Sequence, residues 1–116
     1  MKLYEYQVKE IFSKYGIGIQ KGKLAKTPQE AKQVAAVIGG PVVLKSQVLV
    51  GGRGKAGGVK LVDDLNDVEK AADKILKTKI KEYKPVGILV LEKISFTWYS
   101  YSFILYYAPS SKILLI

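Results

Sequence analysis

The glycine-rich segment Gly51–Gly58 is the part of the chain whose residue types best suit chemistry on an anion. It has five glycines in eight residues, and the only arginine, Arg53, stands among them. Glycine has no Cβ, so its backbone amides can approach phosphate oxygens closely, and the guanidinium fork fits two such oxygens. Lys45 closes the apolar run before the segment. We therefore predict that this glycine-rich loop binds phosphate, with Arg53 and Lys55 inside it and Lys45 just before it.

Two common phosphate-binding motifs do not fit this loop. A Walker A loop needs Gly-Lys-Ser/Thr before a helix, but Gly54-Lys55 runs into Ala56. A dinucleotide fingerprint also opens a helix, whereas the apolar, strand-like run Val59–Val62 follows here. The loop is thus expected to join two strands as a flexible flap. A hairpin whose glycines serve only turn geometry is the alternative.

Glu92 is the second candidate for binding. It ends the apolar run Ile88–Leu91, and no acidic residue follows it. A carboxylate at a strand end can accept hydrogen bonds from a ribose hydroxyl or a base amino group. The alternative is a surface residue paired with Lys93.

The aromatic run Phe96–Phe103 can stack on bases, but it contains no basic residue, so a half-buried sheet is favoured there.

Composition narrows the function classes. The net charge is +9, which favours an anionic partner such as a nucleotide. The chain has neither histidine nor cysteine, which excludes disulfides, thiolate zinc sites and the commonest general base. Any chemistry must therefore use Lys, Arg, Asp, Glu, Ser or Tyr side chains, or backbone amides. Its most apolar stretch, Ile94–Tyr107, is shorter than the roughly 20 residues that span a bilayer. A preference for lysine over arginine without cysteine is typical of a heat-adapted cytoplasmic protein.

The elements that must position these residues follow from apolar periodicity and caps. Helices are predicted from Tyr4 to a stop at Gly16, from Pro28 to Gly39 behind the Thr27 cap, and over 65–75. Strands are predicted over 22–26, 41–45, 59–62, 87–92, 99–107 and 112–116. This alternation predicts an α/β fold (an α+β sandwich), with a mixed sheet and two or three helices in a single domain over 1–116.

Two segments resemble a known family. Met1–Gln7, and Val43–Val48 followed by Gly51–Lys60, are similar to the amino-terminal part of the ADP/GDP-forming succinyl-CoA synthetase β subunit. The resemblance implies an ATP-grasp fold, in which two α/β subdomains hold a nucleotide. It also implies ligation of succinate to coenzyme A with an α subunit, as in the tricarboxylic acid cycle. The resemblance further implies ATP or GTP and magnesium as cofactors, and a phosphohistidine on the α subunit.

The resemblance also implies roles for individual residues. Lys45 would contact the nucleotide phosphates, and Gly52, Arg53 and Gly54 would form the loop that covers them. Glu92 would bind near the base or ribose, with Ser95 along the same edge.

Some positions depart from the family. Ser100 replaces a nucleotide-contacting glutamate, and Ala108-Pro109 replaces an Asp-Arg pair. The resemblance places the family's magnesium ligands beyond Ile116, so we expect a truncated relative that has no catalytic residue and no metal site of its own and does not ligate alone. One alternative is a noncatalytic module that self-associates through its exposed carboxy-terminal strand, Lys112–Ile116. Another, less favoured, is a small basic nucleic-acid binder.

Overall fold

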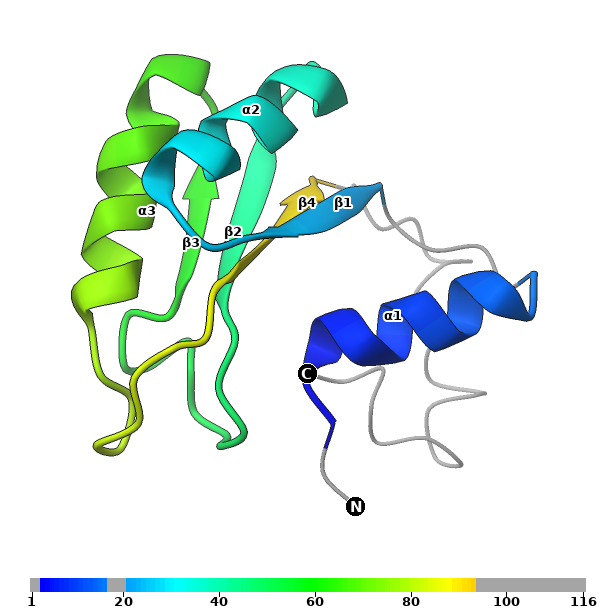
Figure 1. Cartoon of the computed structure of the whole chain (residues 1–116). Helices are drawn as coiled ribbons and strands as arrows, with labels where there is room; N and C mark the ends of the chain where they lie inside the picture. The colour runs from blue at the N-terminus through cyan, green and yellow to red at the C-terminus, as the bar shows by residue number, and fades with distance from the viewer. Residues whose placement is uncertain (1–2, 17–20, 94–116) are drawn as a thin grey trace, which may run out of the picture.

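The computed structural model describes residues 3–16 and 21–93 (Figure 1). The predicted strands over 99–107 and 112–116, and Ser95, lie outside these residues. The elements in chain order are α1 (Glu5–Lys14), β1 (Gly22–Ala25), α2 (Pro28–Ile38), β2 (Val42–Ser46), β3 (Val59–Val62), the short 3-10 helix η1 (Leu65–Asp67), α3 (Val68–Lys77) and β4 (Ile88–Glu92).

The four strands form one sheet in the order β1-β4-β2-β3. The α/β class is confirmed, but the expected mixed sheet is not found, because all three pairings among the described strands are antiparallel. β1 and β2 run in the same direction, as do β3 and β4, yet another strand separates each pair. β4 lies between β1 and β2, and β2 lies between β3 and β4. The two helical crossovers thus join parallel strands that are not neighbours.

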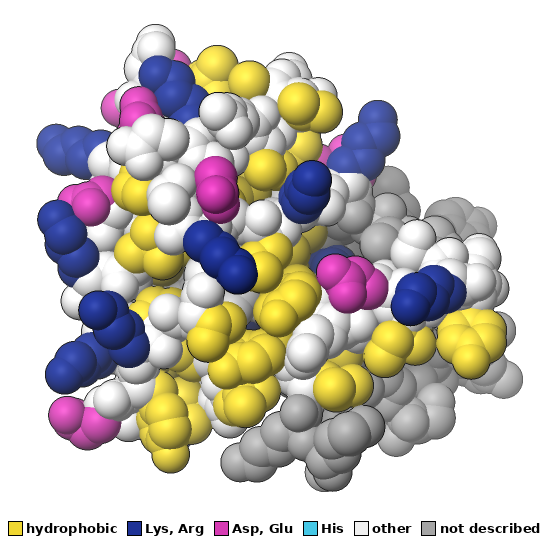
Figure 2. Space-filling model, in the orientation of Figure 1, with side chains coloured by type: hydrophobic (Ala, Val, Ile, Leu, Met, Phe, Trp, Pro, Cys, Tyr) yellow, Lys and Arg dark blue, Asp and Glu magenta, His cyan; other side chains and the backbone are white. Residues whose placement is uncertain are grey.

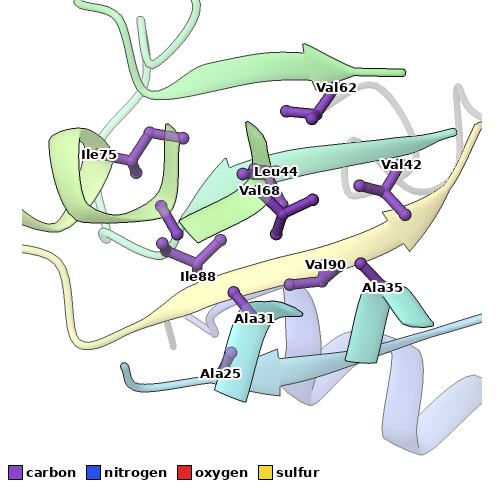
Figure 3. Close-up of a cluster of buried hydrophobic side chains, with 11 residues drawn as sticks. Ala25, Ala31, Ala35, Val42, Leu44, Val62, Val68, Ile75, Ile88 and Val90 are labelled. Atoms are coloured by element: carbon purple, nitrogen blue, oxygen red, sulfur yellow. The ribbon is translucent and has the colours of Figure 1, made fainter. Parts of the chain in front are cut away.

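Helices α2 and α3 cover one face of this sheet, and α1 lies on the other side (Figure 1). Figure 3 shows the core between the sheet and the two helices. Leu44 of β2 and Val90 of β4 are fully buried there, because alternate strand residues face the helices. The alanines of α2, Ala31 and Ala35, are small enough to let that helix approach the strands closely.

The helix ends follow the signals in the sequence. Thr27 Oγ1 accepts a hydrogen bond from Glu30 N at 3.1 Å, which caps α2, and Pro28 occupies the first helical position. Gly39 ends α2 with a left-handed φ of 79°. Asp64 Oδ1 accepts from Asn66 N at 2.9 Å and starts η1, which leads into α3. None of the helices in the described segments is long and apolar enough to cross a membrane.

Candidate phosphate-binding site

The glycine-rich loop joins β2 to β3 and is closed at its base by backbone hydrogen bonds. Ser46 N donates to Gly58 O at 2.7 Å, and Gly58 N donates to Arg53 O at 2.6 Å. Gly52 and Gly57 have φ near 80°, in the left-handed region that favours glycine. The prediction that the loop joins two strands is confirmed; these strands pair antiparallel, and the hydrogen bonds fix the base of the loop.

Gly58 is required for packing. A Cβ at this position would lie 2.5 Å from Ile80 Cδ1 and 3.1 Å from Arg53 O. The fully buried Ile80 belongs to the turn before β4, so this turn packs directly against the loop. The loop is therefore fixed both by packing against the turn before β4 and by backbone hydrogen bonds to the end of β2.

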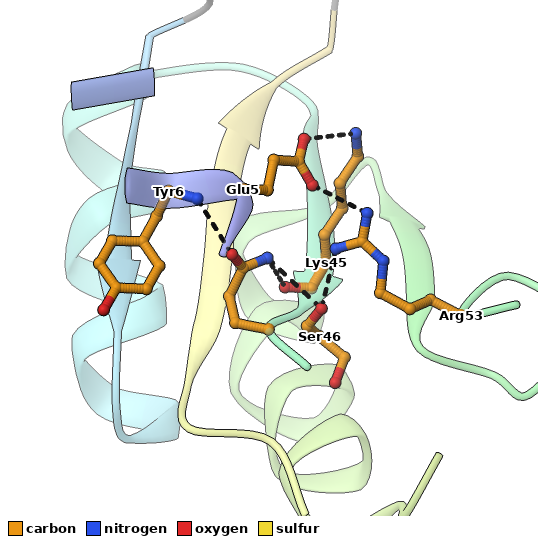
Figure 4. Close-up of polar contacts among 6 residues, drawn as sticks. Glu5, Tyr6, Lys45, Ser46 and Arg53 are labelled. Carbon is orange, nitrogen blue, oxygen red and sulfur yellow. Dashed lines mark hydrogen bonds and ion pairs between the residues drawn. The ribbon is translucent and has the colours of Figure 1, made fainter. Parts of the chain in front are cut away.

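Lys45 and Arg53 meet at one carboxylate, that of Glu5 in the first turn of α1 (Figure 4). Lys45 Nζ lies 3.1 Å from Glu5 Oε1, and Arg53 Nη2 lies 3.0 Å from Glu5 Oε2. Arg53 Nη1 also donates to the backbone oxygen of Ser46 at 3.0 Å. The exposed fractions of the three side chains are 21% for Lys45, 7% for Arg53 and 9% for Glu5. The predicted pair of cations is thus assembled, with an unforeseen anion between them.

The inward direction of the Arg53 side chain alters its expected role. Its guanidinium ties the loop to the end of β2 and to α1, while Gly52 and Gly54 on either side of it are exposed. In this arrangement the loop presents its glycine backbone to solvent, and the arginine anchors it from within.

Gln47 is a second polar residue that the sequence analysis did not select. Tyr6 N donates to Gln47 Oε1 at 3.1 Å, and Gln47 Nε2 donates to Lys45 O at 3.1 Å. Its side chain is only 1% exposed. Gln47 therefore satisfies one of the open N–H groups at the start of α1 and fixes that helix to the end of β2. The sequence did offer one signal that Gln47 has a structural role, namely that it is a polar residue in the middle of an apolar run.

Glu92 lies at the other end of the sheet from Lys45. It pairs with Val42, whereas Lys45 pairs with Leu89, three residues away along β4. At about 3.4 Å per residue, the two backbone positions are about 10 Å apart along the strand. Glu92 Oε1 accepts from Lys21 N at 2.9 Å. The structure thus places Glu92 on β4, next to β1, and does not bring it into the Glu5 cluster.

A cavity of about 330 Å³ opens between α1 and the sheet. Its lining includes Tyr6, Lys9 and Ser13 of α1, and Lys23 and Leu89 of the sheet. Burial lowers the pKa of Lys9; Glu5 opposes that shift and Lys45 adds to it. Lys9 therefore lies within the electrostatic field of the Glu5 cluster. Among the described residues, no group of three or more His, Cys, Asp or Glu side chains could hold a metal ion.

The sequence matches the family of the ATP-grasp domain over residues 2–101. It is 50% identical over 96 residues to the succinate–CoA ligase [ADP-forming] subunit beta of Roseiflexus sp., covering 83% of this chain and 25% of that protein. It is 49% identical over 94 residues to the succinate–CoA ligase [GDP-forming] subunit beta of Thermus thermophilus, covering 81% and 25%. The chain spans about a quarter of the length of these relatives.

Solved structures agree with this assignment. The dinucleotide-forming acetyl-coenzyme A synthetase 1 of Ca. Korarchaeum cryptofilum, in complex with coenzyme A, Ca-AMPCP and HgCl+, superposes with a TM-score of 0.72 at 32% identity, over 82% of this chain and 44% of that one. A biotin carboxylase from Campylobacter jejuni gives a TM-score of 0.65 at 24% identity, over 78% and 20%, which shows the fold alone. The chain therefore belongs to the ATP-grasp family, and its sequence relatives there are β subunits of succinate–CoA ligase.

Proposed function

We propose that this chain is the nucleotide-binding part of a succinate–CoA ligase β subunit. In this role it holds the polyphosphate of ATP or GTP while a larger assembly, including an α subunit, joins succinate to coenzyme A. The setting is the tricarboxylic acid cycle in the cytoplasm of a heat-adapted organism. Ligation by these 116 residues alone is not expected, because they span only a quarter of the relatives' length.

The convergence of Lys45, Arg53 and the glycine-rich loop at one end of β2 is the observation that carries this proposal. Lys45 supplies a positive charge at the strand end, and the exposed backbone of Gly52 and Gly54 can donate N–H groups to phosphate oxygens. Support also comes from the acetyl-coenzyme A synthetase relative, whose structure contains Ca-AMPCP.

Glu92 and Ser95 are proposed for the nucleoside end. The separation of about 10 Å between the Lys45 and Glu92 positions suits a ligand that lies extended along the sheet, with phosphates at one end and the base at the other. The described side chains do not form a magnesium site, so no step of the reaction is assigned to a metal held by them.

Calorimetric titration of ATP and of GTP, each with magnesium, into the chain tests the proposal. Lys45→Met and Arg53→Ala are each expected to weaken nucleotide binding by about tenfold or more, because each removes a cation of the cluster. Lys77→Met is the matched control, since Lys77 is exposed on α3 and pairs only locally with Asp73. Wild-type protein without nucleotide affinity, or unchanged affinity in both variants, contradicts the proposal.

A further inference from the structure

Glu5 is the only described acidic side chain in an ion pair with either cation of the proposed phosphate site. It uses one oxygen for each cation, Oε1 for Lys45 and Oε2 for Arg53. Its partners lie 40 and 48 residues further along the chain. One carboxylate therefore links three separate parts of the molecule: the start of α1, the end of β2 and the glycine-rich loop.

Burial makes this link strong. Glu5 and Arg53 are each more than nine-tenths buried, so water screens their ion pair far less than it screens a surface pair. Removing the carboxylate alone would leave the Arg53 guanidinium buried without its counter-charge. The side chain would then turn outward to water, and the loop that carries it would follow.

The neighbouring contacts fix the position of Glu5 itself. Gln47 accepts a hydrogen bond from Tyr6 N, which belongs to the next residue of α1, and so holds this end of the helix against β2. The Glu5 carboxylate also contacts the Lys45 ammonium, at 3.1 Å, and so fixes where its positive charge lies. Glu5 can thus orient Lys45 towards an anionic ligand.

We propose that Glu5 is a positioning residue for the polyphosphate. Its ion pair with Arg53, called the latch below, holds the glycine-rich loop in the geometry that binds phosphate, and its ion pair with Lys45 orients that lysine. The role in binding rests on the proposed function, whereas the latch itself does not. Glu5 contacts the two cations rather than the ligand, so its loss acts through them.

The single arginine gives a direct test of the latch. An arginine-specific endoproteinase can cut the chain only after Arg53, into fragments 1–53 and 54–116. With Arg53 held by Glu5, cleavage of folded wild-type protein is expected to be slow. Glu5→Gln is expected to raise the rate about tenfold or more, because the guanidinium is released. Glu10→Gln, the same change on an exposed residue of α1, is the control and leaves the rate unchanged.

A second variant separates the latch from a loss of folding. Lys45→Met leaves the Glu5–Arg53 ion pair in place, so cleavage is expected to stay slow while ATP affinity falls. Circular dichroism melts establish that each variant is folded at the digestion temperature. If Glu5→Gln is folded and is cut as slowly as wild type, the latch is wrong.

Nucleotide titrations then test the role in binding. Glu5→Gln is expected to weaken ATP and ADP binding by about tenfold and to leave adenosine affinity unchanged, a contrast that general destabilisation would not produce. Unchanged or tighter ATP binding in this variant overturns the positioning role. Wild-type protein that binds no nucleotide refutes the proposed function and the positioning role with it, while faster cleavage of Glu5→Gln still supports the latch.

Discussion

At the scale of residues, Lys9 has an unfavourable environment whose effect on stability depends on pH. Burial lowers its pKa below the usual 10.5, Glu5 offsets part of that shift, and Lys45 adds to it. The unfolded chain therefore binds more protons than the folded chain between the lowered pKa and 10.5. In that window the free energy of unfolding rises with pH.

Lys9→Met is consequently expected to be more stable than wild type near neutral pH, where Lys9 is charged in both the folded and the unfolded chain and its burial therefore costs free energy. The difference is expected to shrink as the pH approaches 10.5, since the wild-type lysine then becomes neutral. Urea unfolding at about pH 7 and about pH 10 measures the two differences. Lys77→Met, the same change at an exposed lysine of α3, shows how much a lysine-to-methionine change alters the free energy of unfolding without burial. A Lys9→Met effect that does not change with pH would contradict the assignment.

At the scale of elements, the turn before β4 has unusual residues for its geometry. Ile80 and Tyr83 exchange both backbone hydrogen bonds, at 2.9 and 3.0 Å, around Lys81 and Glu82. Both central residues have positive φ, 50° for Lys81 and 69° for Glu82. Such two-residue hairpin turns strongly prefer glycine or asparagine, because a side chain is strained there.

Glu82→Gly is expected to raise the free energy of unfolding by about 1 kcal/mol, through relief of that strain. The same change at Glu10, inside α1, is expected to lower it by about 1 kcal/mol, because glycine weakens a helix interior. Opposite shifts of the thermal midpoint are the expected result. Equal destabilisation by both changes would show that the turn is not strained.

Local sequence signals predicted the helices and strands of the described residues, but not how the strands pair. The Thr27-Pro28 start and the Gly39 end of α2 depend on neighbours in the chain, so they could be read directly. The strand order could not be predicted from the sequence, since β1 has only four residues and nothing in them selects β4 as its partner. Glu5 escaped prediction for the same reason: its contacts lie 40 or more residues away. Lys45 and Arg53 are only eight residues apart in the sequence, in β2 and in the loop that follows it, so the sequence analysis could find them together.

At the scale of the whole molecule, a cluster of apolar side chains joins the sheet to α2 and α3. The space-filling view shows basic side chains spread over the visible surface, with hydrophobic groups between them (Figure 2). Leu44 lies in the centre of the core between the sheet, α2 and α3, with no exposed surface. Leu61 on β3 is 45% exposed.

Leu44→Ala is expected to lower the free energy of unfolding by about 2–5 kcal/mol, because it removes buried methyl groups and leaves a cavity. Leu61→Ala, with the same change in chemistry, is expected to cost less than about 1 kcal/mol. Urea midpoints of the two variants give the comparison. Similar losses at both positions would mean that the two layers are not joined through Leu44.

The central place of β4 sets the order in which this sheet can assemble. β4 is the last described strand to be synthesised, yet among the described strands it is the only neighbour of β1 in the sheet. The β2–β3 hairpin can pair as soon as residue 62 is available, whereas β1 must wait until residue 92 has been made. During synthesis on the ribosome, β1 is therefore the described strand that stays unpaired for longest, and insertion of β4 joins β1 to the β2–β3 hairpin in one late, cooperative step.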